Sequence, residues 1–494
     1  MSTISIMLFS DFHSKLFAFE TNLSLISSIK TDSRRSLNED PPITAPELLI
    51  VCGDLVQGTG DLDDFDAGIL EITEQYNKIK EFLNMLCEEM FDGDNNKIIV
   101  VPGNHDVSWP HSIQSMEEKE YKSEYVRYLK TPAQNIRWSW GEDEPSFFEI
   151  TNYEQYNQRM SPFSEFYGSL YNGAREYFLD PTKQFDIFVY PEKKLLIVGF
   201  NSCFYNDHLN EIGMIHPECL ARCHSEISKE KYNAFLKISV CHHGVQGTPT
   251  MQDFMDERTY QSMLDKGFHI GFHGHYHKYN LVNIRFQVDP SLTIPVFGCG
   301  TLYSSSQSIP LGSSRQYSII EIDPSFTNVR YHLRTAIEQA HGLPIWMPGN
   351  IIQNKGKSYL DVPITSFKPD IKREGEVSSV QEIPVDYKEL MVIDDFIKNQ
   401  EYQLALDRLV SLDNKNPIVR RLMIECNYFL ENDDDCIALI GVPNTITEFT
   451  YLVDVLERNR KSPDLHEIID QLDSHEIISN SELYKRIKKK LGGM

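Results

Sequence analysis

Several short apolar runs in the sequence end in residues that can bind metal ions or transfer protons. The clearest run covers residues 98–102 and leads into Gly103-Asn104-His105-Asp106, which places an amide, an imidazole and a carboxylate in one turn. A strand end can hold such side chains rigidly beside a ligand. Other apolar runs end in the same way, which gives seven candidate metal ligands: Asp11, His13, Asp54, Asn104, His242, His275 and His277.

Seven oxygen and nitrogen donors are too many for one ion, and they suit two divalent metal ions that share a bridging carboxylate. Mixed nitrogen and oxygen ligands favour manganese, with iron, zinc or nickel as alternatives, over calcium or magnesium. Two ions about 3.5–4 Å apart lower the pKa of bound water and hold the attacking and leaving oxygens of a phosphate. Their positive charge exceeds the negative charge of Asp11, Asp54 and a bridging hydroxide together. Such a centre attracts a phosphate anion.

The elements that deliver these ligands can be predicted from the hydrophobic pattern. Strands are expected at residues 4–9, 48–52, 97–101, 194–200, 237–241 and 268–272, and later at 294–300, 317–322 and 329–333. Helical periodicity predicts helices at residues 16–29 and 66–90. Because strands and helices alternate early and strands dominate later, the sequence predicts a mixed α/β (α+β) fold for this region.

An aromatic-rich insertion is expected at residues 107–171, directly after the Asn-His-Asp turn. Two interpretations stay open. Most of its rings are expected to form the core of a cap, and some could instead stack on a substrate base or ring beside the site.

Size and composition set further limits. A chain of 494 residues is too long for one ordinary core, so we expect two domains. The net charge of −25 makes the surface as a whole repel nucleic acid and anionic membranes, unless a local cationic site overrules it. Nine scattered cysteines without a disulfide pattern indicate a reducing compartment, and we expect a cytoplasmic protein. We expect no signal peptide and no membrane association.

The pattern changes after residue 345. Prolines and polar residues predict a linker, or an arm lying across a surface, over residues 346–380, which leaves residues 1–345 as the first domain. Residues 381–494 are predicted to form a smaller all-α domain. Within it, residues 399–406 and 432–439 align at a spacing of 33 and resemble tetratricopeptide repeats. Ordinary amphipathic helices would also explain this alignment.

The motifs together resemble those of the calcineurin-like metallophosphoesterases. All five occur in the family order over about residues 1–335: Asp11-x-His13, Gly53-Asp54, Gly103-Asn104-His105-Asp106, His242 and Gly274-His275-x-His277. The resemblance implies a four-layer arrangement, in which two sheets form a β-sandwich flanked by helices. A glycine-rich run at residues 297–301 also resembles the strand that the family places after its last histidines.

The same resemblance implies a role for each residue. One metal ion would be held by Asp11, His13, Asp54 and His277, and the other by Asp54, Asn104, His242 and His275, so that Asp54 bridges. His105 is expected to be catalytic. Oriented by Asp106, it would contact the phosphate and stabilise or protonate the leaving group. Since the first histidine of such a pair is the usual ligand, we expect His242 rather than His243 to bind metal.

These expectations converge on a dimetal phosphohydrolase in which a metal-bridging hydroxide attacks phosphorus. A phosphodiesterase acting on a nucleotide or another phosphate ester is favoured. A different hypothesis is a DNA or RNA nuclease that works within a multi-protein assembly, recruited by a protein partner through residues 381–494. A phosphomonoesterase and an inactive scaffold are less favoured hypotheses.

Overall fold

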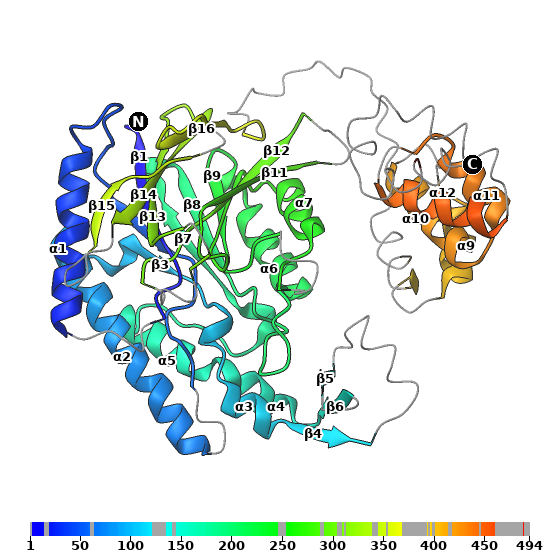
Figure 1. Cartoon of the computed structure of the whole chain (residues 1–494), viewed down its shortest axis with the longest axis horizontal. Helices are drawn as coiled ribbons and strands as arrows, with labels where there is room; N and C mark the ends of the chain where they lie inside the picture. The colour runs from blue at the N-terminus through cyan, green and yellow to red at the C-terminus, as the bar shows by residue number, and fades with distance from the viewer. Residues whose placement is uncertain are drawn as a thin grey trace. The chain divides into compact units, whose positions relative to one another are not determined.

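The computed structural model describes two compact units, Met1–Arg373 and Glu374–Met494, each considered by itself (Figure 1). The described residues of the first unit are 2–13, 19–59, 64–120, 135–140, 145–245, 253–286, 291–303, 309–310, 313–337, 344–351 and 354–367. Those of the second unit are 393, 396–397, 401–412, 417–443, 446–459 and 488. None of the helices in these ranges is both long and apolar enough to span a membrane.

The first sheet of the larger unit is built on three parallel strands, β1 (Ile4–Phe9), β2 (Leu48–Val51) and β3 (Ile98–Val100). Its described strands follow the order β15-β14-β13-β1-β2-β3, and β16 also pairs with β14. The outer members are β13 (Gln316–Ile322), β14 (Asn328–Ile337), β15 (Ile345–Pro348) and β16 (Tyr359–Pro363). Every residue of β1, β2 and β3 is buried, as expected for parallel strands covered on both faces.

The second sheet has the order β11-β12-β10-β9-β8-β7. Its strands are β7 (Phe185–Tyr190), β8 (Leu195–Phe200), β9 (Leu236–Val240), β10 (Ile270–His273), β11 (Asn280–Arg285) and β12 (Thr293–Gly298). Successive side chains of β8 point to opposite faces of the sheet. Leu195 and Ile197 join the core shared with the first sheet, whereas Leu196 and Val198 join a separate core.

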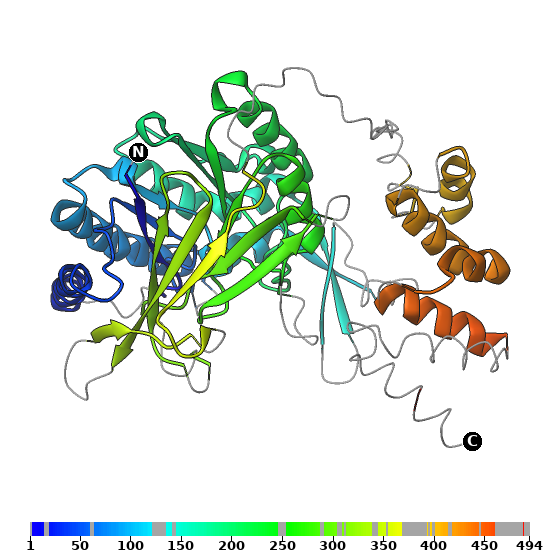
Figure 2. The same ribbon diagram turned by 90° about the horizontal axis from the view of Figure 1, so that it is seen from above.

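Helices cover the outer face of each sheet (Figures 1 and 2). Helices α1 (Phe19–Ser36), α2 (Phe65–Met90) and α5 (Ser161–Leu170) contribute to the core of the first sheet. Helices α6 (Pro217–Ile227) and α7 (Glu257–Asp265) pack on the far side of the second sheet. The predicted four-layer α/β sandwich is therefore confirmed.

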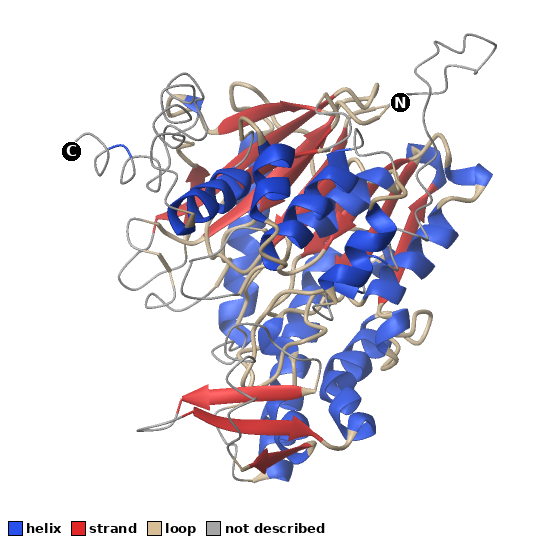
Figure 3. Ribbon diagram, turned by 90° about the vertical axis from the view of Figure 1, so that its right-hand side faces the viewer, coloured by secondary structure: helices blue, strands red, loops and turns tan. Residues whose placement is uncertain are grey.

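The insertion after β3 contains a small antiparallel sheet, at the lower end of the molecule in Figure 3. The strands of this sheet are β4 (Met116–Lys119), β5 (Ile136–Trp140) and β6 (Pro145–Ile150). Two short helices of the insertion flank them in the sequence, α3 (Trp109–Gln114) and α4 (Tyr153–Asn157). The rings of Phe163 and Phe166 lie against Tyr76 of α2, within the main core. For these rings the structure supports packing rather than contact with a substrate.

Strands β15 and β16 lie largely within residues 346–380, for which the sequence predicts a linker. β15 pairs with residues 334–337 of β14, and β16 pairs with residues 328–332 of the same strand. Trp346 of β15 is buried against Tyr317, with ring centroids 4.9 Å apart. The sequence did not predict these short strands because prolines and polar residues, which are typical of linkers, also occur in edge strands. Residues 368–380 lie outside the described ranges.

The second unit contains four described α-helices: α9 (Tyr402–Leu409), α10 (Pro417–Phe429), α11 (Asp433–Ile440) and α12 (Ile446–Arg458). The predicted spacing of 33 aligns Ala405 with Ala438, but Ala405 is buried and Ala438 is exposed. The buried positions of α9, Ala405 and Leu409, correspond instead to Cys436 and Ile440 of α11. The helical prediction is confirmed, and the resemblance to repeats stays a prediction.

Candidate metal centre

The seven candidate ligands lie together because each follows the carboxyl end of a parallel strand. Asp11 and His13 follow β1, Asp54 follows β2 and Asn104 follows β3. His242 follows β9, and His275 and His277 follow β10, in the second sheet. In open α/β sheets this end of the strands is where ligands bind. The sandwich therefore brings ligands from both sheets to one edge.

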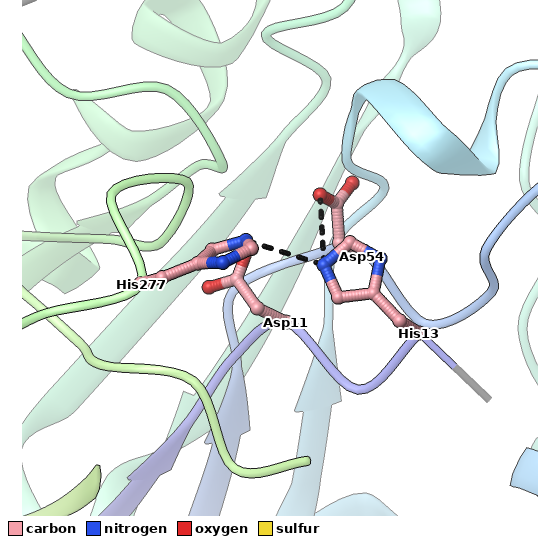
Figure 4. A group of neighbouring side chains, drawn as sticks. All are labelled: Asp11, His13, Asp54 and His277. Atoms are coloured by element: carbon pink, nitrogen blue, oxygen red, sulfur yellow. Dashed lines mark hydrogen bonds and ion pairs between the residues drawn. The ribbon is translucent and has the colours of Figure 1, made fainter. Parts of the chain in front are cut away.

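Asp11, His13, Asp54 and His277 form the first group, with one potential ligand atom from each within 4.8 Å of all the others. Figure 4 shows these four side chains pointing toward one another. His13 Nε2 lies 3.2 Å from His277 Nε2 and 3.9 Å from Asp54 Oδ2. His277 Nε2 lies 3.3 Å from Asp11 Oδ1.

The second group shares Asp54 with the first. His242 Nε2 lies 3.4 Å from Asp54 Oδ2 and 2.9 Å from Asn104 Oδ1. His275 Nδ1 lies 3.2 Å from both Asn104 Oδ1 and His242 Nε2. Thus Asp54 Oδ2 lies within 4 Å of imidazoles from both groups, as a bridging carboxylate requires.

These distances fit two bound cations. Two atoms that bind one ion at about 2.0–2.2 Å lie roughly 3 Å apart. The contacts between His13 and His277, and between His242 and His275, bring imidazole nitrogens to 3.2 Å. In addition, Asp11 Oδ2 is buried without a hydrogen-bond partner among the described residues. Oxygen and imidazole donors of this kind suit first-row divalent ions.

The backbone at the site adopts conformations that are uncommon for residues with side chains. Among the described residues, eleven non-glycine residues have positive φ, and five of these are the candidate ligands Asp11, His13, Asp54, His275 and His277. Each such residue costs about 1 kcal/mol or more, and such residues cluster at functional sites. The fold therefore holds these ligands in place at a cost in stability.

Two glycines allow the strand ends to approach closely. Gly53 has a φ of +87°, and a Cβ there would lie 2.6 Å from His242 Nδ1. A Cβ on Gly103 would collide with the carboxylate of Asp54. Larger residues at these positions would push ligands apart.

Burial and mutual proximity change the ionisation of the ligands. Burial by itself raises the pKa values of Asp11 and Asp54, but neighbouring imidazoles lower both below the ordinary value, Asp54 strongly. Burial lowers the pKa of His13 to about 4. Burial also lowers the pKa of His242. The neighbouring Asp54 carboxylate outweighs this effect and raises the pKa of His242 to about 9. Two buried, ionised carboxylates thus give the site its attraction for cations.

Partners behind the ligands orient two of the imidazoles. His242 Nδ1 lies 2.7 Å from the carbonyl oxygen of Cys52, so this nitrogen carries the proton and Nε2 faces the site. His275 Nε2 lies 3.2 Å from Asp253 Oδ2. His243 instead contacts Ser202 through Nδ1, at 2.9 Å, whereas His242 Nε2 contacts Asn104 Oδ1. The sequence analysis missed Asp253, which follows no predicted strand.

His105 lies beside the two groups. Its ring centroid is 4.8 Å from that of His13, and its backbone N–H donates to Asp54 Oδ1 at 2.9 Å. Its Nδ1 lies 2.9 Å from the carbonyl oxygen of Gln57. The ring is half-buried, so a bound molecule can reach it.

Asp106 has a different position from the one we expected. Its carboxylate accepts the backbone N–H of Gly103 at 2.7 Å and of Leu55 at 3.2 Å, and the Tyr76 hydroxyl at 3.0 Å. Burial and the nearby Asp54 carboxylate raise the pKa of Asp106 to about 7. The expectation that Asp106 orients the His105 ring is therefore corrected. Asp106 fixes the loops that carry Asp54 and His105, and Gln57 holds the ring.

Comparison with known proteins agrees with the geometry. The model of the family described as calcineurin-like phosphoesterase matches residues 4–279, more than half of the chain. A search of curated protein sequences finds no match.

Similar solved structures include GAP50, described as the anchor in the inner membrane complex of Plasmodium, with 10% identity, coverage of 75% of this chain and 91% of that chain, and a TM-score of 0.33. A dimetal phosphatase from Danio rerio has 9% identity, coverage of 74% and 100%, and a TM-score of 0.38. The calcineurin-like phosphoesterase YfkN from Bacillus subtilis has 12% identity, coverage of 74% and 91%, and a TM-score of 0.28. Because these scores are low, the assignment depends on the family match, which shows that this chain belongs to the calcineurin-like phosphoesterases.

Proposed function

We propose that the protein is a metal-dependent phosphohydrolase with two divalent ions, and that it cleaves phosphodiesters. The observation that carries this proposal is the position of Asp54 between two ligand groups, with Oδ2 3.9 Å from His13 Nε2 and 3.4 Å from His242 Nε2. A shared carboxylate sets two cations close together. Paired cations at such a distance suit phosphoryl chemistry.

The ligands divide into two sets around Asp54. Asp11, His13 and His277 would complete the first metal position, and Asn104, His242 and His275 would complete the second. Bound there, two divalent ions would activate a water molecule and neutralise negative charge on a phosphate. Manganese is the ion we propose, with iron, zinc or nickel as alternatives, because imidazole, carboxylate and amide donors together suit first-row divalent ions.

His105 is proposed to contact the leaving group and donate a proton to it. Because Nδ1 faces the Gln57 carbonyl, that nitrogen keeps a proton, and when the ring is protonated Nε2 carries the second proton, which can face a substrate oxygen. A positioned imidazole can donate a proton to a leaving alkoxide. The half-buried position beside His13 supports this role.

We place a nucleotide or another phosphodiester first among the substrates. A phosphomonoester is the alternative that the assays below distinguish.

The helical unit supports a separate role in binding a protein partner. It has its own cores, around Ile424 and Phe449 and around Ala405 and Leu422. Large apolar side chains remain exposed on it, including Leu404, Val410 and Phe429. Recruitment to a nucleic-acid substrate through such a partner is the second candidate. All nine cysteines are free and buried, which supports a cytoplasmic location.

A panel of manganese-dependent assays tests the proposal. Purified protein should hydrolyse bis(p-nitrophenyl) phosphate faster than p-nitrophenyl phosphate, and a chelator should abolish both activities. Cyclic nucleotides and single- and double-stranded DNA then separate nucleotide phosphodiesterase from nuclease activity. Faster cleavage of the monoester would overturn the diester proposal. Absence of hydrolysis across the panel in the presence of manganese would favour an inactive scaffold.

A further inference from the structure

The two nitrogens of His275 face different partners. Nδ1 lies 3.2 Å from Asn104 Oδ1 and from His242 Nε2, at the second metal position. Nε2 points away from that position and lies 3.2 Å from Asp253 Oδ2. Since a neutral imidazole carries one proton, a carboxylate at Nε2 keeps the proton there and leaves the lone pair of Nδ1 facing the metal position.

Asp253 is held in this place by the chain that follows it. The backbone N–H of Met255 donates to the carbonyl oxygen of Gly244 at 2.8 Å, and the Met255 side chain is buried in the core of the second sheet. Asp256 then caps α7 by accepting the N–H of Arg258 at 2.8 Å. These contacts hold Met255 and Asp256 in place, and so position the adjacent Asp253 beside His275.

The ring nitrogen of His275 that faces away from the metal position has a charged partner, unlike the corresponding nitrogens of two other candidate ligands, His242 and His13. The outer nitrogen of His242 faces a neutral carbonyl, that of Cys52, at 2.7 Å. His13 Nδ1 is buried with no hydrogen-bond partner among the described residues. The Asp253 side chain is 19% exposed and that of His275 is 10% exposed, so water screens this charged contact only partly.

We propose that Asp253 is a positioning residue that strengthens metal binding at the second position by fixing the tautomer of His275 and making its Nδ1 a better donor. This inference rests on the proposed function, because it assumes that His275 binds a metal ion. Removal of a carboxylate behind a ligand histidine lowers metal affinity by about 10–100-fold. In this protein, only the second metal position should lose affinity.

Titration calorimetry of the full chain with Mn²⁺ tests the inference. Wild-type protein should bind two ions. Asp253→Ala should keep one affinity unchanged and weaken the other by about 10–100-fold, and Asp253→Asn should fall between Asp253→Ala and wild type. Asp256→Asn is the matched control, because the same change in the same segment retains a good helix cap and should leave both affinities unchanged.

A second measurement separates positioning from a general structural role. In a His275→Ala background, Asp253→Ala should have no further effect on manganese affinity, because Asp253 acts through that ring. An additional loss in the double variant would overturn the inference. So would equal weakening of both positions, or unchanged affinities, in Asp253→Ala. Wild-type protein that binds no manganese would overturn the proposed function as well, so the two failures are distinguishable.

Discussion

Asn104 Oδ1 lies 2.9 Å from His242 Nε2, although the two residues are 138 positions apart and follow strands of different sheets. The proposed second metal position therefore lies where the two sheets of the sandwich meet. Its geometry depends on how closely the ends of β2, β3 and β9 approach one another. Gly53 and Gly103 make that approach possible, since a Cβ at either would contact a ligand or its loop.

Gly103→Ala should disrupt the site without unfolding the protein. The added methyl group would collide with the Asp54 carboxylate, so we expect loss of bound metal and a rate about 100-fold lower. Metal content and hydrolysis of bis(p-nitrophenyl) phosphate measure both effects. Gly168→Ala, in helix α5, is the matched control, because a Cβ there has its nearest neighbour at 3.9 Å. Normal metal content and rate in Gly103→Ala would contradict the close-approach argument.

His105→Ala should leave metal binding near normal while lowering kcat strongly. The ring lies beside His13 but bonds Gln57, so its removal takes away no proposed ligand. If His105 protonates the leaving group, kcat should fall about 10²–10⁴-fold. The loss should be smaller for p-nitrophenyl esters than for alkyl esters, because a good leaving group needs no proton. Equal losses would indicate charge stabilisation instead, and loss of metal would make His105 a ligand.

Much of the site could be predicted because its residues follow strands that are buried on both faces. The strand at residues 4–9 was predicted with the observed bounds, and α2 starts one residue before the predicted residue 66. Continuous apolar runs such as that of β1 have no exposed face, so tertiary context alters them little. The polar residues after these runs, such as Asp11 and His242, could then be recognised as candidate ligands.

Other features depend on contacts that leave no sequence pattern. Asp253 reaches His275 because Met255 bonds Gly244, and such a loop contact has no periodicity. Asp106 was misassigned because its sequence position beside His105 does not show that its carboxylate turns toward Gly103 and Leu55. Strand β16 has one buried residue, Val362, among exposed and half-buried neighbours, a pattern that a linker also permits.

The buried ion pair between Arg137 and Asp207 should be important for the stability of the insertion. Arg137 Nε lies 2.6 Å from Asp207 Oδ2, and both side chains are almost fully buried. Arg137→Met leaves Asp207 as an unpaired buried charge, so unfolding free energy should fall by about 3–5 kcal/mol. Urea denaturation measures the change. Arg330→Met is the control, since it breaks an exposed pair with Asp361 and should cost about 1 kcal/mol or less. Equal costs would contradict this assignment.

Removal of the helical unit should leave catalysis intact when the truncated chain still contains strands β15 and β16. A chain of residues 1–373 keeps β15 and β16 and should fold, bind two metal ions and hydrolyse a chromogenic diester at near full rate. A chain of residues 1–345 loses the buried Trp346 and the pairing of β16 with β14, and should be insoluble or markedly less stable. Size-exclusion chromatography and thermal unfolding compare them. A rate reduced more than about tenfold in the longer chain, with metals still bound, would make the helical unit part of the active site.

The central claim is that Asp54 joins two metal positions, and the metal content of Asp54→Asn tests it most directly. Wild-type protein reconstituted with manganese and desalted should hold two ions per chain by elemental analysis. Asp54→Asn should lose both, whereas His13→Ala and His242→Ala should each lose mainly one, since their nitrogens lie at different positions around Asp54 Oδ2. Retention of two ions per chain by Asp54→Asn would contradict the account.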